Sequence, residues 1–163
     1  MSEQILANIR TLIKEFSGQI KEYENLRKEL LECYREVLEL LNNATYKPRR
    51  DSIDLAIIES FSYGPGNVYT HREELRFADG ELKVFAVTIY HMNASCSEKE
   101  VAGGDDAVEY AVKILEKYED IENRFDKIVT EIANSLDRTS NYFKNRNKKL
   151  VKKIEAVRKA LKQ

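Results

Sequence analysis

The chain has 163 residues and a mass of 19.0 kDa, with 27 Lys and Arg against 28 Asp and Glu, two Cys and no Trp. A hydrophobic content of 42% is enough for the core of one domain, whereas 34% charged residues, six Gly and two Pro exclude collagen-like and low-complexity chains. Apolar runs are short and the N-terminus carries no signal-peptide pattern, so we expect neither a membrane span nor secretion.

Residues 1–44 are predicted to form one long helix, because apolar side chains recur in alternating steps of four and three. Gln19 is the one strongly polar position of this seam, which contains Ile5, Ile9, Leu12, Phe16, Gln19, Tyr23, Leu26, Leu30, Cys33, Val37, Leu40 and Ala44. Such a repeat is typical of a left-handed coiled coil, and about 42 residues at ~1.5 Å each give a helix about 63 Å long. A second apolar line beside the seam indicates packing on more than one neighbour, and a helix of an ordinary globular bundle is the alternative.

Residues 45–104 are predicted to hold a three-stranded antiparallel meander with its turns and loops. The segments rich in Ile, Val, Tyr, Phe and Thr are 53–63, 68–77 and 81–92. The sequence of residues 64–67, Gly-Pro-Gly-Asn, suits a tight turn, and Asp79-Gly80 suits a two-residue hairpin. Residues 95–104 are expected to form a loop.

The hairpin turn predicts which strand residues face one another: Phe77 and Leu82, Leu75 and Val84, Tyr69 and Tyr90. The third strand is then apolar on both faces, and strands of that kind are normally covered on both sides. We expect the helices of the chain to cover one face and another subunit the other. The residues predicted for this oligomer interface are Leu82, Val84, Phe85, Val87 and Ile89.

Residues 105–163 are predicted to form a second long helix, with Asp105 and Asp106 at its N-terminus. Its apolar seam contains Ala111, Ile114, Tyr118, Ile121, Phe125, Ile128, Ile132, Leu136, Phe143, Leu150, Ile154, Val157 and Leu161. Poor helix formers in residues 137–147 leave a kink or break there as an alternative. Paired antiparallel with the first helix, an unbroken helix of about 88 Å would project past its partner.

Motifs for catalysis or for metal binding are absent from the sequence. It contains neither a phosphate-binding glycine loop nor zinc-ligand spacing. In the predicted hairpin, His71 and His91 point to opposite faces, and Cys33 occupies a helix seam where cysteine acts as a small apolar residue. Two cysteines without a spacing pattern favour a reducing compartment. We therefore expect a cytoplasmic protein that is not an enzyme and has no catalytic residue, metal or cofactor.

Residues 144–163 carry nine basic residues and one acid, so this segment is +8 and the remaining 143 residues are −9. Helix-dipole stabilisation acts over one turn and does not account for five. The segment predicts a polyanion-binding surface, with nucleic acid as the first candidate, through Lys144, Arg146, Lys148, Lys149, Lys152, Lys153, Arg158 and Lys159. An acidic surface of a neighbouring subunit and an anionic membrane surface are the alternatives.

Together these features predict a single α+β domain over residues 1–163, in which two long helices form an antiparallel coiled-coil stalk around a central meander. This order of helix, strands and helix resembles the layout of prefoldin subunits, although no sequence motif of that family is present. The resemblance implies a chaperone-like protein. We expect a homo-oligomeric, non-enzymatic scaffold or interaction protein, with a nucleic-acid-binding accessory protein as the alternative.

Overall fold

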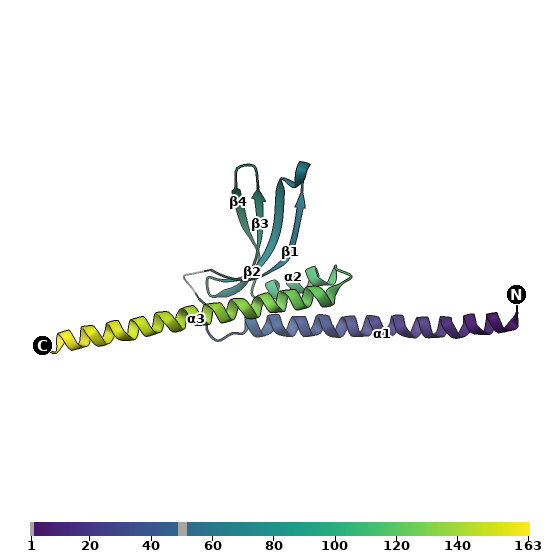
Figure 1. The fold of residues 1–163 in the computed structure, drawn as a ribbon, viewed down its shortest axis with the longest axis horizontal. Helices are drawn as coiled ribbons and strands as arrows, with labels where there is room; N and C mark the ends of the chain where they lie inside the picture. The colour runs from purple at the N-terminus through teal and green to yellow at the C-terminus, as the bar shows by residue number, and fades with distance from the viewer. Residues whose placement is uncertain (1, 49–51) are drawn as a thin grey trace.

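The computed structural model describes residues 2–48 and 52–163. Its elements are α1 (Glu3–Asn42), β1 (Ile53–Tyr63), the short 3-10 turn η1 (Pro65–Asn67), β2 (Tyr69–Ala78), β3 (Glu81–Tyr90), β4 (Ser95–Gly103), α2 (Asp105–Glu116) and α3 (Ile121–Leu161). The sheet is antiparallel with the strand order β1-β2-β3-β4 and stands on one side of the helices (Figure 1). The α+β class and the two long terminal helices are therefore confirmed.

The β2–β3 hairpin has the register that its turn predicts. Phe77 pairs with Leu82, Leu75 with Val84, and Tyr69 with Tyr90. Asp79 and Gly80 have φ angles of 55° and 75°, and two positive φ angles in a two-residue loop match the twist of the flanking strands.

The expected three-stranded sheet is wrong, because residues 95–103 form a fourth strand. β4 pairs with β3 from Tyr90 opposite Ser95 to Lys83 opposite Gly103. Its sequence, SCSEKEVAG, contains one β-branched residue and no aromatic residue. Because these residue types are the ones that favour strands, the sequence predicts a loop here. Charged side chains are common on edge strands, where they discourage pairing with another chain.

α2 packs antiparallel on α1 and determines where the chain turns back. Asn42 donates to Asp105 at the start of α2, and Arg35 pairs with Glu109, about one turn further along α2. Arg27 then donates to the main-chain carbonyls of Glu116 and Tyr118, at 2.6 and 2.9 Å. A cation at these carbonyls satisfies the free acceptors at the helix end and ends α2 against α1.

The second long helix begins only after a break at residues 117–120, and residues 137–147 lie within one continuous helix. The Asp120 side chain accepts a hydrogen bond from the main-chain N–H of Asn123 and caps α3. Because this turn reverses the chain, α3 runs in the same direction as α1 and lies beside only its C-terminal part (Figure 1). The two long helices do not form the expected antiparallel stalk within one chain.

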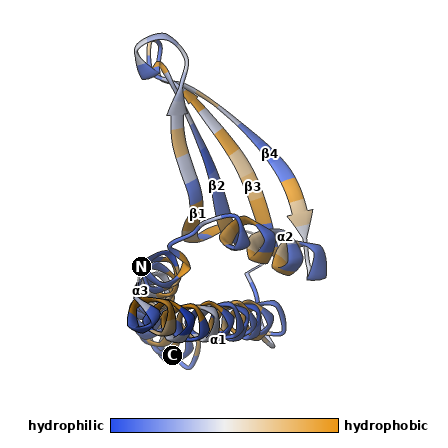
Figure 2. Cartoon of the chain, turned by 90° about the vertical axis from the view of Figure 1, so that its right-hand side faces the viewer, coloured by the Kyte–Doolittle hydropathy of each residue, from blue (hydrophilic) through white to orange (hydrophobic). Residues whose placement is uncertain are grey.

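The core lies where α1, α2 and α3 meet the base of the sheet (Figure 2). Tyr34, Leu38, Leu75, Leu82 and Val84 are fully buried there. The N-terminal part of α1 and the C-terminal part of α3 extend beyond this core in opposite directions (Figure 1). We call residues 3–26 the α1 arm and residues 136–161 the α3 arm.

Candidate interaction site

The α1 arm exposes the apolar seam that its heptad repeat predicts. Side chains from Ile5 to Leu26 on this seam are between 42% and 66% exposed, and they are Ile5, Ile9, Leu12, Phe16, Tyr23 and Leu26. Leu6, Ile13 and Ile20 on the neighbouring line are also exposed. Near the core, the Tyr23 hydroxyl donates to the Glu119 carbonyl at 3.4 Å. A continuous apolar stripe that stays exposed along a helix is typical of an interaction surface.

The α3 arm exposes the continuation of a stripe that is buried nearer the sheet. Ile121, Ile128 and Ile132 of this stripe are 2–3% exposed in the core. Beyond them its apolar residues are 44–79% exposed, and they are Phe143, Leu150, Ile154, Val157 and Leu161. The same helix face therefore packs in the core at one end and is open at the other.

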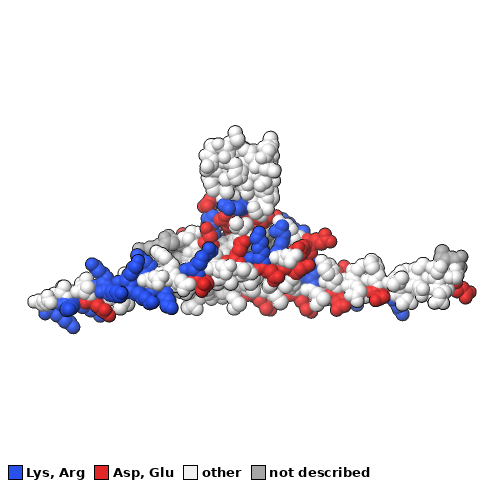
Figure 3. Space-filling view, in the orientation of Figure 1, with Lys and Arg blue, Asp and Glu red and all other residues white. Residues whose placement is uncertain are grey.

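All eight residues predicted to bind a polyanion lie on the α3 arm and are exposed. Figure 3 shows Lys and Arg gathered along this arm, while acidic side chains gather near the sheet base and along α1. The eight residues lie within about four turns of one helix. Their positive charges therefore add up to one region of positive electrostatic potential.

The residues predicted for the sheet interface divide between two environments. Leu82 and Val84 are fully buried under the helices, so they belong to the core of the chain. Phe85, Val87 and Ile89 lie on the opposite face of the sheet, as their register positions require. Val87 is 1% exposed because Arg72 and Glu98 flank it on the neighbouring strands. An oligomer contact through this face stays a prediction.

Arg76 is the centre of an ion-pair network on that face of the sheet. Its guanidinium lies 2.5 Å from Glu74, 2.8 Å from Glu98 and 3.0 Å from Asp54, and 4.7 Å from the centre of the Phe85 ring. Hydrogen bonding to Glu98 is the main cause that raises the pKa of Arg76, and the same bond lowers the pKa of Glu98. The network joins β1, β2 and β4.

On the other face, two tyrosines attach the α2–α3 region to carboxylates of the sheet. The Tyr110 hydroxyl donates to Glu73 at 2.5 Å, and the Tyr118 hydroxyl donates to Glu59 at 2.8 Å. Burial, and then these hydrogen bonds, raise the pKa of both tyrosines. His71 lies 3.4 Å from Glu73, whereas His91 hydrogen-bonds Thr70 on the opposite face, so the two histidines lie apart as the hairpin register predicts.

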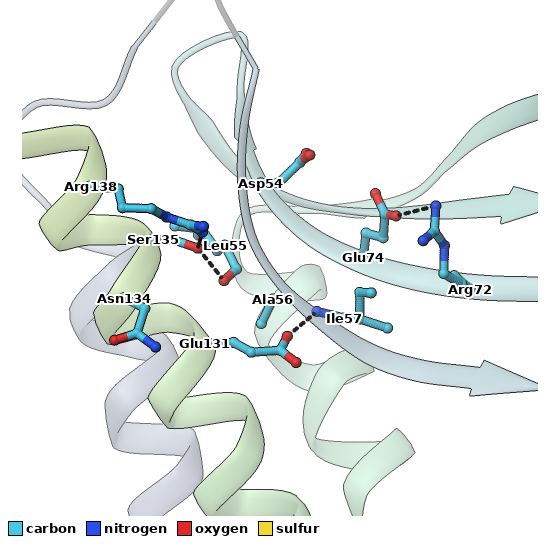
Figure 4. A pocket seen from close by; sticks show the side chains of 10 residues that line it. All are labelled: Asp54, Leu55, Ala56, Ile57, Arg72, Glu74, Glu131, Asn134, Ser135 and Arg138. Carbon is cyan, nitrogen blue, oxygen red and sulfur yellow. Dashed lines mark hydrogen bonds and ion pairs between the residues drawn. The ribbon is translucent and has the colours of Figure 1, made fainter. Parts of the chain in front are cut away.

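A shallow cleft of about 430 Å³ lies between β1 and α3 (Figure 4). Glu131 accepts a hydrogen bond from the Ile57 N–H at 2.9 Å, and the Ser135 hydroxyl donates to the Leu55 carbonyl at 3.0 Å. These are main-chain groups on the outer edge of the sheet, which require partners. The polar side chains of the cleft therefore hold the edge strand onto α3.

The end of the sheet farthest from the helices carries no charged side chain. Residues 60–71 and 86–97 contain no Lys, Arg, Asp or Glu, and Figure 3 shows this end as an uncharged block above the charged base. Aromatic rings follow one another across it: Tyr63 stacks on Tyr69 at 5.1 Å, and Tyr69 lies 5.0 Å from Tyr90. Aromatic enrichment with few charges is typical of the centre of protein interfaces.

Sequence reasoning missed this uncharged sheet end. Its signal was the two charge-free stretches, which stand out in a chain that is 34% charged. In the part of the chain that the structure describes, no three His, Cys, Asp or Glu residues come together to hold a metal ion. No described helix is long and apolar enough to cross a bilayer. Comparisons with protein-family models, curated proteins and solved structures find no match to the chain.

Proposed function

We propose that the protein is a non-enzymatic scaffold that assembles with itself through its helical arms and displays its sheets to a protein partner. The observation that carries this proposal is the pair of arms, each with an open apolar seam at heptad spacing. Both seams are arranged as in coiled coils, which need a second helix to exclude water from the seam. The uncharged sheet end supplies a surface suited to the partner.

The surface area supports assembly independently of the seam pattern. The chain exposes 12036 Å², whereas a compact monomer of its mass exposes about 8,400 Å². The difference exceeds the roughly 800 Å² that each partner buries in an interface of standard size. Coverage of both arms would bring the exposed area toward that of an ordinary folded protein.

Sedimentation analysis of the wild type and of two matched variants tests the proposal. Phe16→Glu places a charge on the α1 seam, and Ser17→Glu places the same residue one position away, outside the seam. We expect the wild type and Ser17→Glu to sediment as an oligomer at micromolar concentration, and Phe16→Glu to dissociate. A wild type that is monomeric at these concentrations would overturn the proposal.

Nucleic-acid binding through the α3 arm is a second candidate function. It is favoured by the exposure of all eight predicted cations on one continuous helix. Basic side chains that contact the phosphates of duplex DNA release its condensed counterions, so the affinity for DNA should fall steeply as the salt concentration rises. Its test is among the predictions below.

A further inference from the structure

The two arms of one chain point away from each other, so neither can cover the other. α1 and α3 run in the same direction, and the α1 arm extends from one end of the core while the α3 arm extends from the opposite end (Figure 1). A two-fold axis perpendicular to the long axis of the molecule would relate it to a second copy that points in the opposite direction. That copy then lays its α3 arm antiparallel along the α1 arm of the first, and its α1 arm along the other α3 arm.

We propose that the protein forms such an arm-exchanged dimer, with a second copy of the chain as the occupant of both seams. This inference rests on the proposed scaffold function and names the partner and the register of its arms. The lengths agree: 24 residues of the α1 arm are about 36 Å long, and 26 residues of the α3 arm are about 39 Å long.

The two seams match layer by layer when the helices are antiparallel. Along the α1 seam the steps from Ile5 are four, three, four, three, four and three, and the same steps lead backward from Leu161 along α3. The resulting layers, with the α1 residue first, are Ile5 and Leu161, Ile9 and Val157, Leu12 and Ile154, Phe16 and Leu150, Gln19 and Asn147, Tyr23 and Phe143, Leu26 and Ser140. Each layer joins an a position to a d position, as antiparallel packing requires, because the order of a and d along the second helix is reversed.

The polar residues of the seams identify this register among the alternatives. Gln19 is the only strongly polar seam residue of the α1 arm, and the register places Asn147 opposite it. Two amides in one layer can hydrogen-bond each other. A shift by one heptad in either direction separates them and buries Asn147 against a leucine, Leu12 or Leu26. A buried amide layer is a known means of fixing register at some cost in stability.

The residues beside the seams agree with the same register. At the g positions, Glu15 faces Lys153 and Glu22 faces Arg146. At the e positions Ile13 faces Val151, while Leu6 faces Arg158 and Ile20 faces Lys144. The aliphatic stems of Arg158 and Lys144 can cover apolar side chains while their charged ends stay in water. Charge pairing at e and g positions selects partner and orientation in coiled coils, and this register contains no like-charge pair at these positions.

Thiol cross-linking tests the register directly in a Cys33→Ser, Cys96→Ser background. Leu12→Cys combined with Ile154→Cys places two thiols in one layer of the dimer, so a short bis-maleimide should yield a covalent dimer. The matched control is Ile5→Cys with Phe143→Cys, two seam positions that the register separates by about 27 Å. We expect little cross-linking in that control and in Leu12→Cys alone.

Charge reversal gives a second test that does not depend on cross-linking. Two double variants create like-charge pairs in both arm contacts: Glu15→Lys with Glu22→Lys, and Arg146→Glu with Lys153→Glu. Each double variant should raise the dimer dissociation constant by about tenfold or more at low salt. Mixing the two variants should restore assembly as a heterodimer, because its arm contacts are one wild-type and one doubly reversed.

The outcomes separate the inference from the function on which it rests. Cross-linking of Leu12→Cys alone, or a mixture that fails to recover assembly, would overturn arm exchange while leaving self-assembly in place. A wild type that stays monomeric would overturn both. Selective cross-linking of the matched pair, with recovery in the mixture, would support the arm-exchanged dimer.

Discussion

The rings of Tyr34 and Phe125 meet edge to face, with their centroids 6.1 Å apart and their planes inclined by 70°. This contact joins α1 to α3 at the place where the two helices lie side by side. Tyr34 is fully buried, and no described residue forms a hydrogen bond with its hydroxyl. The Tyr34 ring therefore stabilises the core, whereas its buried hydroxyl group, without a hydrogen-bond partner, lowers the stability of the protein.

Tyr34→Phe should stabilise the protein by about 1 kcal/mol, because it removes a buried hydroxyl without a partner and keeps the ring. Urea unfolding followed by circular dichroism measures the change. Tyr110→Phe is the matched control: it removes a hydroxyl that donates to Glu73, so it should destabilise the protein by about the same amount. A loss of stability in Tyr34→Phe equal to that in Tyr110→Phe would contradict the prediction.

Arg76→Met should lower the free energy of unfolding by about 3 kcal/mol, because it leaves the buried Glu74 without its closest cation. Arg72 still lies 3.3 Å from Glu74, which is why we expect the lower end of the range for broken buried pairs. The second change Glu74→Met should recover much of the loss in the double variant. Equal stability of the single and double variants in urea would contradict this expectation, because it would show that an unpaired Glu74 carries no cost.

Stability should fall as the pH rises above about 10, the pKa of tyrosine in an unfolded chain. The pKa values of Tyr110 and Tyr118 are raised in the folded state, so the folded protein holds these protons more tightly. Their contribution is complete below the unfolded pKa and is lost as the pH rises through the folded pKa.

Urea midpoints between pH 8 and pH 11 measure this loss. The variant Tyr110→Phe, Tyr118→Phe should lose less stability over this interval than the wild type, although it starts lower. Tyr142→Phe, at an exposed tyrosine, should follow the wild-type curve. Parallel curves for all three proteins would exclude a role for the two hydroxyl groups.

Duplex DNA should bind to the α3 arm without sequence preference if the second candidate function holds. With about six phosphate contacts, the logarithm of the association constant should fall against the logarithm of salt concentration with a slope of about −5. Lys148, Lys149 and Lys152 lie outside the a, d, e and g positions of the proposed dimer. Changing all three to Glu should therefore weaken binding and leave the sedimentation of the protein unchanged.

Fluorescence anisotropy with a labelled duplex measures both effects. Lys14→Glu with Lys21→Glu, on the outer face of the α1 arm, is the control. No binding by the wild type at low salt, or equal weakening by both variants, would remove the α3 arm as a nucleic-acid surface. Binding to anionic vesicles but not to DNA would indicate a membrane surface instead.

The double change Gln19→Leu, Asn147→Leu should raise the thermal stability of the dimer and reduce its choice of register. Replacement of a buried amide layer by leucines removes a polar burial and the feature that opposes a heptad shift. Each single change should stabilise less, because it leaves one amide facing a leucine. In the cross-linking assay, the double variant should show new products for mismatched cysteine pairs; unchanged selectivity would contradict the role of this layer.

Local patterns were sufficient to predict α1 and the β2–β3 register, because a heptad seam and an Asp-Gly turn act over neighbouring residues. The break before α3 was missed because Tyr118 and Ile121 continue the apolar periodicity across it, although Asp120 is a good N-cap. Apolar periodicity also does not specify which helix covers a seam. For that reason the sequence predicts an antiparallel partner for α1, while the structure places α3 beside it in the same direction.

The continuity of α3 through residues 137–147 determines whether assembly of this protein would stop at a pair. Two unlike surfaces that meet head to tail close into a pair only when the second contact returns to the first molecule; otherwise copies add without end. With α3 unbroken, the two arms extend in opposite directions from the core (Figure 1), which permits closure. A bend among its Ser, Thr and Asn residues would direct the arm to a third molecule, so a change in this one segment would convert a closed pair into a growing filament.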